Sequence, residues 1–211
     1  MDKERETRAT WNKVAKIYED KFMQLDLYDH TYDCFLKGMP TPNARLLDVG
    51  CGPGNITKYI LSKNPEFDIL GIDLAPNMIA RAKKNNPTAN FLIMDSRHID
   101  QLTTNFDGII CGFCLPYLSS EACADLLNNA QQLLNRNGRL YLSFVEGRPA
   151  SSGFKGSHMG RVYMYYHQLE DLKKQLLKLH FKDLKTFKVA YTLSESTYET
   201  HTILIASKME A

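Results

Sequence analysis

Residues 46–55 have the sequence LLDVGCGPGN, in which a short apolar segment leads into a glycine-rich turn. The apolar residues predict a buried strand over Arg45–Val49, and a helix is expected from about Ile56 to Lys63. Glycines at this density suit a backbone that must approach a ligand closely, because a residue without a Cβ leaves room beside its main-chain atoms. The turn therefore predicts a ligand site at the end of the first strand.

Strand and helix patterns alternate along the chain after this turn. Short apolar segments predict strands over residues 68–73, 91–94, 106–111 and 139–145. Helices are predicted between and after them, one opened by Pro76, one stopped by Asn137-Gly138 and one over residues 169–179. Strands that alternate with helices predict an α/β fold, with a mostly parallel sheet covered by helices on both faces.

The two ends of the chain depart from this alternation. Residues 9–37 carry apolar side chains at spacings of three and four, which predicts an amphipathic helix that caps the domain ahead of the first strand. Residues 189–193 and 201–206 are two late strands with no helix between them, so an antiparallel hairpin is expected at one edge of the sheet. We expect a single domain over residues 1–211, with the N-terminal helical cap over residues 1–40.

The composition is that of a soluble globular protein. Of the 211 residues, 44% are hydrophobic and 24% are charged, and no apolar run approaches the roughly 18 residues that span a bilayer. The first ten residues, MDKERETRAT, are too charged for a signal peptide. The net charge is +2 with both signs interspersed, unlike the basic stripe of a nucleic-acid binder. Five cysteines without a disulfide-type spacing favour a reducing, cytoplasmic setting.

Polar or glycine features follow three of the predicted strands. The glycine turn follows the first strand, Asp73 ends the second and Asp95 follows the third. In parallel sheets the carboxyl ends of the strands share one edge, and ligands bind in the crevice outside it. We therefore expect these three features to converge on one crevice.

Asp48 and Asn55 distinguish two ligands for this crevice. A glycine turn with an acid about 20 residues later is typical of dinucleotide binding, but Asn55 stands where the third glycine of that motif belongs. We expect the Asp48 carboxylate to face the ligand, where it would repel a pyrophosphate. S-adenosylmethionine tolerates such an acid, because it carries a sulfonium and an ammonium, and its one carboxylate can use free amides at the helix start. In the alternative, Asp48 only holds its own turn, which is compatible with the same ligand.

The other polar residues suit the same ligand. A carboxylate at a strand end can accept hydrogen bonds from both ribose hydroxyls, which suits Asp73. Asp95 and Ser96 are placed to hydrogen-bond the amino edge of adenine, and Met78 can cover the nucleoside. These residues predict an S-adenosylmethionine site.

Five segments carry a resemblance to a known family: LLDVGCGPGN, GIDLAPNMIARAKK, FLIMDS, FDGIICGFCLPYL and LLNRNGRLYLSF. They occur in the order and spacing of the class I S-adenosylmethionine-dependent methyltransferases, which the chain resembles over residues 45–145, and YMYYHQLEDLKKQLLKLHF is similar to that family's final helix region. The resemblance implies a Rossmann-like seven-stranded sheet, with S-adenosyl-L-methionine as the cofactor. The cofactor contacts expected on this basis are Tyr18, Asp48, Gly50, Cys51, Gly52, Asp73, Leu74, Met78, Asp95, Ser96 and Cys111.

The resemblance extends to the cap and differs on the acceptor side. Members of the family often add an N-terminal helix that closes over the cofactor, and Trp11, Ala15 and Tyr18 match its pattern. Tyr117 stands where many small-molecule methyltransferases carry a histidine.

The acceptor pocket is expected between the N-terminal helix and a substrate-side insertion over residues 146–167. Its predicted walls are Tyr18, Tyr117, Tyr163 and His158. Tyr117 and His158 are the candidate catalytic residues, since an imidazole there could serve as a base for a protonated acceptor.

We interpret the chain as a methyltransferase that acts on a small molecule, with no metal, nucleic acid or membrane as partner. Nucleic-acid methylation is one alternative, but enzymes that methylate amino groups place Asn or Asp before Pro-Pro-aromatic, and Cys114-Leu115-Pro116-Tyr117 lacks that polar residue. A module that binds the cofactor without catalysis is another alternative that the sequence leaves open. Cys111 and Cys114 form a C-x-x-C, which also occurs in redox pairs and metal sites, but no second cysteine pair accompanies it.

Overall fold

A seven-stranded sheet organises the chain. In the computed structural model, which describes residues 2–39, 43–157, 160–194 and 196–209, the strands of this sheet follow the order β3-β2-β1-β4-β5-β9-β8. Their bounds are β1 Arg45–Val49, β2 Asp68–Asp73, β3 Asn90–Ile93, β4 Phe106–Gly112, β5 Leu134–Val145, β8 Phe181–Ser194 and β9 Thr197–Lys208. Strands β1 to β5 pair in parallel, whereas β9 runs antiparallel to both β5 and β8. The predicted α/β sheet with an antiparallel C-terminal hairpin is confirmed.

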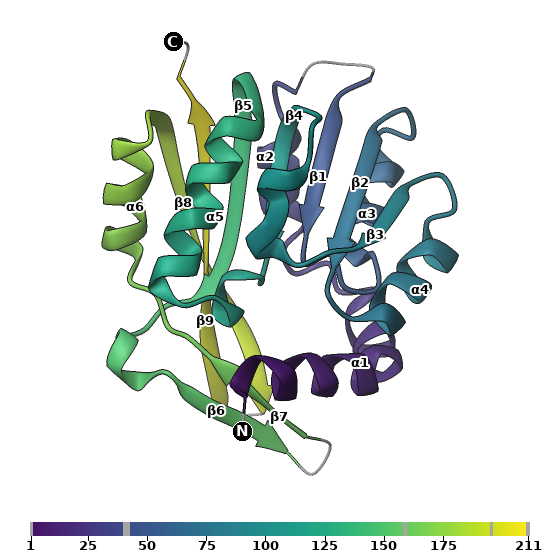
Figure 1. Cartoon of the computed structure of the whole chain (residues 1–211), viewed down its shortest axis with the longest axis vertical. Helices are drawn as coiled ribbons and strands as arrows, with labels where there is room; N and C mark the ends of the chain where they lie inside the picture. The colour runs from purple at the N-terminus through teal and green to yellow at the C-terminus, as the bar shows by residue number, and fades with distance from the viewer. Residues whose placement is uncertain (1, 40–42, 158–159, 195, 210–211) are drawn as a thin grey trace.

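Helices cover both faces of the sheet (Figure 1). On one face α2 (Asp29–Leu36) and α3 (Asn55–Lys63) pack on apolar residues such as Leu46 and Ile110. On the other face α5 (Ser120–Leu133) and α6 (Leu169–Lys178) bury a separate apolar cluster that contains Leu47 and Ile109. Helix α4 (Pro76–Asn85) packs beside β3 through Ala82 and Phe91. No helix within the described ranges combines the length and apolar character needed to cross a bilayer.

The elements at the carboxyl edge of the parallel strands position the site. Helix α1 (Lys3–Phe22) lies across this edge, beside a two-stranded sheet of β6 (Gly153–Ser157) and β7 (Gly160–Met164) (Figure 1). Short 3-10 segments, Ser96–Gln101, Leu115–Tyr117 and Pro149–Ser151, make the remaining turns at this edge. Ion pairs join α1 to its neighbours: Arg81 of α4 lies 2.6 Å from Glu19, and Arg161 of β7 lies 2.5 Å from Glu6.

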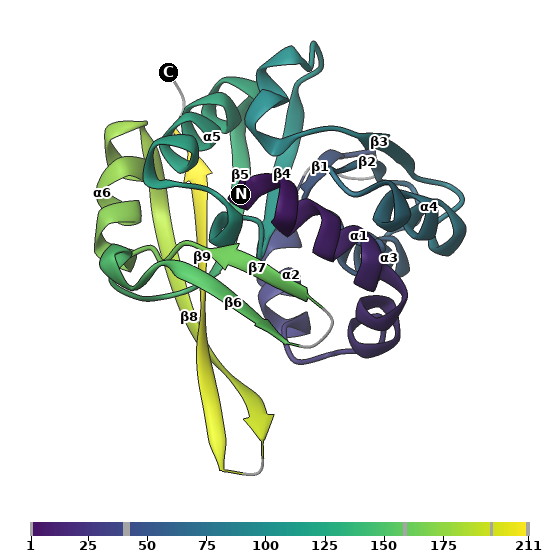
Figure 2. The ribbon, with the colours of Figure 1, turned by 60° about the horizontal axis from the view of Figure 1, so that its bottom comes forward.

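The C-terminal hairpin is longer than the sequence predicts. Strand β9 pairs with β5 only as far as His201, which lies opposite Val145. Beyond that point β8 and β9 pair only with each other and project past the sheet (Figure 2). The predicted strands, 189–193 and 201–206, are correct in type but short. In β8 the missed residues 181–188 lie in the edge strand of the sheet, where charged side chains interrupt the apolar pattern, and in β9 the missed residues 197–200 lie in the exposed projecting part.

The predicted helix over residues 9–37 is two helices. Helix α1 begins at Lys3 and ends at Phe22, and α2 begins only at Asp29. The apolar spacing is continuous, but the two parts bury it against different surfaces: α1 covers the carboxyl edge of the sheet, whereas Phe35 of α2 is fully buried on its face. One straight helix could not reach both surfaces.

The predicted helix stop at Asn137-Gly138 also differs from the structure. Helix α5 ends at Leu133, and Leu134 already pairs with Phe106 as the first residue of β5. Leu134 is 1% exposed. This apolar residue, which by its spacing suggests another helical turn, is therefore buried as part of the sheet. Asn137 has a φ of +59° and lies within β5, where the pairing with β4 shifts register between Leu134 and Arg139.

Candidate functional site

The glycine turn between β1 and α3 forms one wall of a cavity. Gly50, Gly52 and Gly54 have φ values of +71°, +55° and +82°, the left-handed region that glycine adopts without strain. The N–H groups of Gly50 and Cys51 donate to the carbonyl of Ile72 at 2.8 and 2.9 Å. The turn is thereby anchored on β2, and Gly50 and Gly52 line the cavity.

Asp73, the last residue of β2, joins this turn to the start of α4. Its Oδ2 accepts from the N–H of Gly52 at 3.0 Å, and its Oδ1 accepts from the N–H of Ala75 at 2.8 Å. Burial raises the pKa of Asp73, while these backbone hydrogen bonds oppose the rise. A carboxylate has about four acceptor positions, so the two amides leave capacity for hydroxyls of a ligand.

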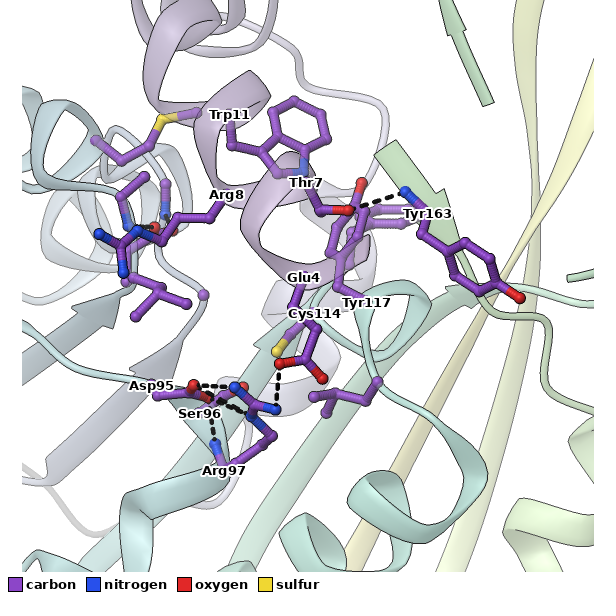
Figure 3. A pocket seen from close by; sticks show the side chains of 18 of the residues that line it. Glu4, Thr7, Arg8, Trp11, Asp95, Ser96, Arg97, Cys114, Tyr117 and Tyr163 are labelled. Atoms are coloured by element: carbon purple, nitrogen blue, oxygen red, sulfur yellow. Dashed lines mark hydrogen bonds and ion pairs between the residues drawn. The ribbon is translucent and has the colours of Figure 1, made fainter. Parts of the chain in front are cut away.

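Asp95 and Ser96 follow β3 and line the same cavity. The Arg97 guanidinium binds the Asp95 carboxylate, with Nη2 to Oδ2 at 2.5 Å, and its Nη1 donates to Glu4 of α1 at 2.7 Å (Figure 3). Burial opposes the charge on Asp95, but the hydrogen bonds from Arg97 hold the pKa of Asp95 below its ordinary value. Arg97, which sequence reasoning missed, therefore ties α1 to the edge of the sheet.

These residues enclose the first cavity, whose volume is about 180 Å³ (Figure 3). Its charged lining consists of the acids Glu4, Asp73 and Asp95 and the cations Lys3, Arg8 and Arg97. Its apolar and aromatic lining includes Leu74, Met78, Met94, Leu118, Tyr163 and Tyr165. Lys3 and Arg8 come from α1, whose polar residues gave no sign in the sequence that they would reach a site at the sheet edge.

Three expected contact residues do not line the first cavity. Asp48 is fully buried, and its Oδ2 accepts from the Thr57 hydroxyl of α3 at 2.7 Å, while burial raises the pKa of Asp48 to about 7. In this structure Asp48 thus ties the turn to α3 and lies outside the first cavity, while its Oδ1 is buried without a hydrogen-bond partner among the described residues. That Asp48 contacts the ligand stays a prediction. Cys111 is also fully buried, and Cys114 lines the cavity instead. Side chains alternate between the two faces of a strand, so residues inside β1 and β4 point into the helix-covered layers. Cys51 lines a second cavity.

Helix α1 brings the predicted Trp, Ala and Tyr pattern over the site. Trp11 packs edge-on against Tyr18 and against Tyr117, with ring centroids 5.5 Å apart in both pairs. Ala15 is buried in a small cluster with Met78 of α4. Burial raises the pKa of both tyrosines, so their hydroxyls are neutral near pH 7. The cap thus supplies a neutral aromatic wall.

A second cavity of about 480 Å³ adjoins the first. The residues that line both are Trp11, Tyr18, Gly50, Gly52, Gly112, Phe113 and Tyr117. Away from this shared wall its lining is mainly apolar and aromatic, with Val14, Phe22, Tyr28, Tyr32, Val145, Val162, Met164 and Tyr191 among its residues. The two cavities therefore meet at the glycine turn and the cap aromatics.

Sequence reasoning missed a polar chain in the wall of the second cavity. The Tyr28 hydroxyl lies 2.6 Å from Nδ1 of His201, and Nε2 of His201 lies 2.9 Å from Oε2 of Glu199. Glu199 and His201 are two residues apart in β9 and so share one strand face. That spacing was the available signal, but it did not indicate that Tyr28, 173 positions away, completes the chain.

The predicted acceptor residues divide between the cavities. Tyr117 lines both, Tyr18 lines both, and Tyr163 lines only the first, where its N–H donates to the Thr7 hydroxyl at 2.9 Å (Figure 3). His158 lies outside the described residues. From the predicted insertion, Lys155, Val162 and Met164 line the second cavity.

Comparison with known proteins connects this site to a family. Residues 46–138 match the family described as the methyltransferase domain. A trans-aconitate 2-methyltransferase of Methylobacterium nodulans is 46% identical over 48 residues, which is 23% of this chain and 19% of that protein. A ribosomal RNA large subunit methyltransferase E of Brachyspira hyodysenteriae is 24% identical over 165 residues, 72% of each chain. The chain spans 37% of the length of a putative methyltransferase of Invertebrate iridescent virus 6 and 19% of that of the Methylobacterium enzyme, so it covers less than half of these two curated relatives.

Solved structures extend the likeness over the whole fold. Magnesium protoporphyrin IX methyltransferase from Synechocystis PCC 6803, with bound S-adenosylmethionine, superposes with a TM-score of 0.73 at 21% identity, covering 99% of this chain and 98% of that chain. At this identity the likeness concerns the fold, so the seven-stranded arrangement is shared.

Proposed function

We propose that this chain, which belongs to the class I S-adenosylmethionine-dependent methyltransferase family, transfers a methyl group from S-adenosyl-L-methionine to a small-molecule acceptor. The junction of the two cavities carries the proposal, since Gly50, Gly52, Tyr18 and Tyr117 line both. A methyl donor in the first cavity and an acceptor in the second would meet at this shared wall. Such alignment of two reactants can lower a barrier by roughly 7–11 kcal/mol.

The residues of the first cavity fit the cofactor. Asp73 keeps acceptor positions for two ribose hydroxyls beyond its bonds to Gly52 and Ala75. Asp95 and Ser96 would receive the amino edge of adenine, while Met78 packs on the nucleoside. The bound cofactor supplies a methyl group on a positively charged sulfur that leaves readily.

The aromatic residues at the junction prepare the transfer. Trp11, Tyr18 and Tyr117 can attract a cation that lies over a ring face, by about 0.5–2 kcal/mol. The same rings exclude water from the space between the cavities. Positioning and water exclusion are therefore the main contributions of this chain, and a base is needed only for an acceptor that arrives protonated.

The domain plan and setting follow the same proposal. We propose one domain whose N-terminal helical region, residues 1–40, caps the site through α1 and whose substrate-side insertion comprises residues 146–167. The lining of the second cavity from α1, β6 and β7 supports this plan. A reducing, cytoplasmic setting is supported by the five free cysteines. The mixed charges and the net charge of +2 favour a partner other than nucleic acid.

RNA methylation is the second candidate, favoured by the likeness to the Brachyspira ribosomal RNA enzyme. Against it, the turn after β4 has Cys114 and Leu115 where amino-group methylases of nucleic acids place a polar residue, and the second cavity is largely apolar. RNA binding with a steep salt dependence would favour this candidate.

Two experiments test the proposed function. Titration calorimetry with S-adenosylhomocysteine should show binding, whereas NAD should not bind; tight NAD binding without S-adenosylhomocysteine binding would overturn the proposal. Incubation with methyl-labelled S-adenosylmethionine and a metabolite extract should then place the label in small molecules. Label in RNA would support the second candidate, and no turnover of a cofactor that binds would indicate a non-catalytic module.

A further inference from the structure

The second cavity contains a hydrogen-bonded chain of three ionisable groups, and the proposed transfer does not yet use it. Glu199, His201 and Tyr28 are linked by contacts of 2.9 and 2.6 Å. All three line the second cavity. His201 and Tyr28 are 7% and 6% exposed, so the chain runs from the partly exposed carboxylate into the apolar interior.

Aromatic rings fix the imidazole in place. Tyr191 and Tyr28 stack on His201 with centroid distances of 4.9 and 6.0 Å and interplanar angles of 12° and 14°. Phe113 contacts the same imidazole edge-on at 4.7 Å. Because Phe113 lines both cavities, His201 is separated from the shared wall by a single ring.

The hydrogen-bond partners determine where the protons lie. Burial lowers the pKa of His201, although the bond to Glu199 opposes this, so the imidazole is neutral near pH 7. Burial raises the pKa of Tyr28, which keeps its hydroxyl protonated. An ionised Glu199 can only accept, so Nε2 carries the imidazole proton and Nδ1 accepts from the Tyr28 hydroxyl. The Tyr28 oxygen retains a lone pair that can accept a further hydrogen bond.

Other charged or titratable groups line the second cavity or act on Tyr28. The cavity lining includes Tyr18, Lys21, Tyr32, Cys51, Tyr117, Lys155 and Tyr191, and Tyr141 of β5 acts on Tyr28 from the core. Lys21 lies over the Tyr191 ring at 5.5 Å. Glu199 is the only carboxylate among the described residues that line the second cavity, so it is the group that balances a proton on His201.

We propose that the second cavity takes a planar aromatic acceptor with an ionisable hydroxyl, and that Tyr28 and His201 take up its proton during methyl transfer. This inference rests on the proposed function. The acceptor oxygen forms its bond to the methyl carbon with its own electron pair, as the carbon–sulfur bond breaks and leaves its pair on sulfur. The acceptor proton passes to the Tyr28 oxygen and the Tyr28 proton to Nδ1 of His201. Glu199 stabilises the resulting imidazolium.

The aromatic class of the acceptor follows from the lining. Phe22, Tyr28, Phe113 and Tyr191 present rings around a volume of about 480 Å³, which accommodates one or two fused rings. Among the described lining residues only Glu199, Lys21 and Lys155 are charged, so an acceptor with more charges than these can pair would lose its hydration there without compensation.

The test uses 4-nitrophenol, whose ionised form is yellow and whose neutral form is colourless, with S-adenosylhomocysteine already bound. The sulfur of S-adenosylhomocysteine is neutral, so it does not itself favour the phenolate as a sulfonium would. Burial alone raises the pKa of a bound phenol. In the wild-type protein we expect the opposite, a phenolate-to-phenol ratio at least tenfold above that of free 4-nitrophenol at the same pH.

Three variants separate the proton relay from simple packing. His201→Gln and Tyr28→Phe should remove the excess of phenolate while S-adenosylhomocysteine still binds, and Glu199→Gln, on the partly exposed hairpin, should reduce it. His30→Gln is the control, because His30 does not line either cavity and its ring contacts Phe187 with centroids 5.9 Å apart. This control should retain the wild-type spectrum.

The outcomes distinguish the two levels of the proposal. Failure of S-adenosylhomocysteine to bind would overturn the proposed function. If it binds but 4-nitrophenol does not, the aromatic acceptor class is overturned. If both bind and the phenolate ratio is the same in wild type, His201→Gln and Tyr28→Phe, the proton relay is overturned.

Discussion

The first and second cavities adjoin, but they are built in different ways. The first takes its main polar residues from the ends of consecutive parallel strands, with Gly50 after β1, Asp73 ending β2 and Asp95 after β3. The second takes its lining from parts of the chain that are far apart, such as Tyr28 before α2, Val162 in β7 and His201 in β9. Local motifs therefore specify the first cavity, whereas long-range packing creates the second.

This difference matches the two tasks of a methyltransferase. A cofactor that never changes can be bound by turns whose geometry is set by the sheet itself. The acceptor differs between enzymes, and in our proposal its site is the second cavity, which is lined by the cap, the β6–β7 insertion and the projecting hairpin (Figure 2). These elements can vary without disturbing the strands that hold the cofactor.

Asp48→Asn gives the largest expected effect and tests whether the acid buried beneath the glycine turn destabilises the fold when it ionises. Asp48 is fully buried with a pKa of about 7, raised from about 4 when unfolded. A raised pKa favours the folded state below pH 4 and loses that contribution as pH rises towards 7. The wild type should therefore lose stability relative to Asp48→Asn as pH rises. The difference in their free energies of unfolding should change by on the order of 4 kcal/mol in favour of Asp48→Asn between pH 4 and pH 8.

Chemical denaturation across this pH range measures the difference. Asp107→Asn at the start of β4 is the control, because Asp107 is only partly buried and binds the N–H of Arg45 at 2.9 Å. Parallel pH profiles for wild type and Asp48→Asn would contradict the assignment of Asp48 as a buried, largely neutral anchor.

Asp73→Ala tests whether the first cavity binds the cofactor separately from the second. Loss of a charged acceptor for two ribose hydroxyls should weaken S-adenosylhomocysteine binding by roughly 1–3 kcal/mol in calorimetry. Asp68→Ala is the matched control at the other end of β2, where Asp68 is exposed and paired with Arg45. An unchanged affinity in Asp73→Ala would show that Asp73 does not contact the ligand.

Val162→Trp tests the second cavity from the opposite side. Val162 lines that cavity from β7, and a larger ring there should occupy the acceptor space. We expect 4-nitrophenol binding to fall at least tenfold, which corresponds to about 1.4 kcal/mol, with S-adenosylhomocysteine affinity kept within about threefold. Leu193→Trp, at an exposed site near the hairpin tip, should change neither. Equal losses of both ligands in Val162→Trp would mean that the two cavities act as one site.

Arg97→Gln has the smallest expected effect and tests whether the ion pairs of Arg97, which link α1 to Asp95 at the first cavity, contribute to cofactor binding. Arg97 bridges Asp95 and Glu4, but its side chain is 36% exposed, so solvent screens the pairs. S-adenosylhomocysteine affinity should change by less than about 1 kcal/mol, and the difference should shrink at high salt. Lys173→Gln, which breaks an exposed pair on α6, should leave binding unchanged. A loss above tenfold that persists in high salt would make Arg97 a direct ligand contact.

Much of the fold was predictable because local patterns and sheet topology agree. The strands at 45–49 and 68–73 were predicted with their observed bounds, and Pro76 opens α4 as expected. The ends of the first three predicted strands and the turns after them gave Gly50, Gly52, Asp73, Asp95 and Ser96, all of which line the first cavity. Parallel strands bring their carboxyl ends to one edge, so adjacency in space followed from order in the sequence.

The tertiary structure alone decided which way the side chains in and after these strands point and which distant segments meet. Asp48 and Cys111 lie inside β1 and β4, where packing buries them away from the first cavity, whereas Asp73 is the last residue of β2 and lines it. The pairing of Tyr28 with His201 depends on how far β9 runs beyond β5 and on where α1 ends. The spacing of apolar residues predicts neither the length of β9 nor the end of α1. Both depend on the free energy of burying α2 on the sheet and α1 across its edge, and these surfaces exist only after the chain has folded.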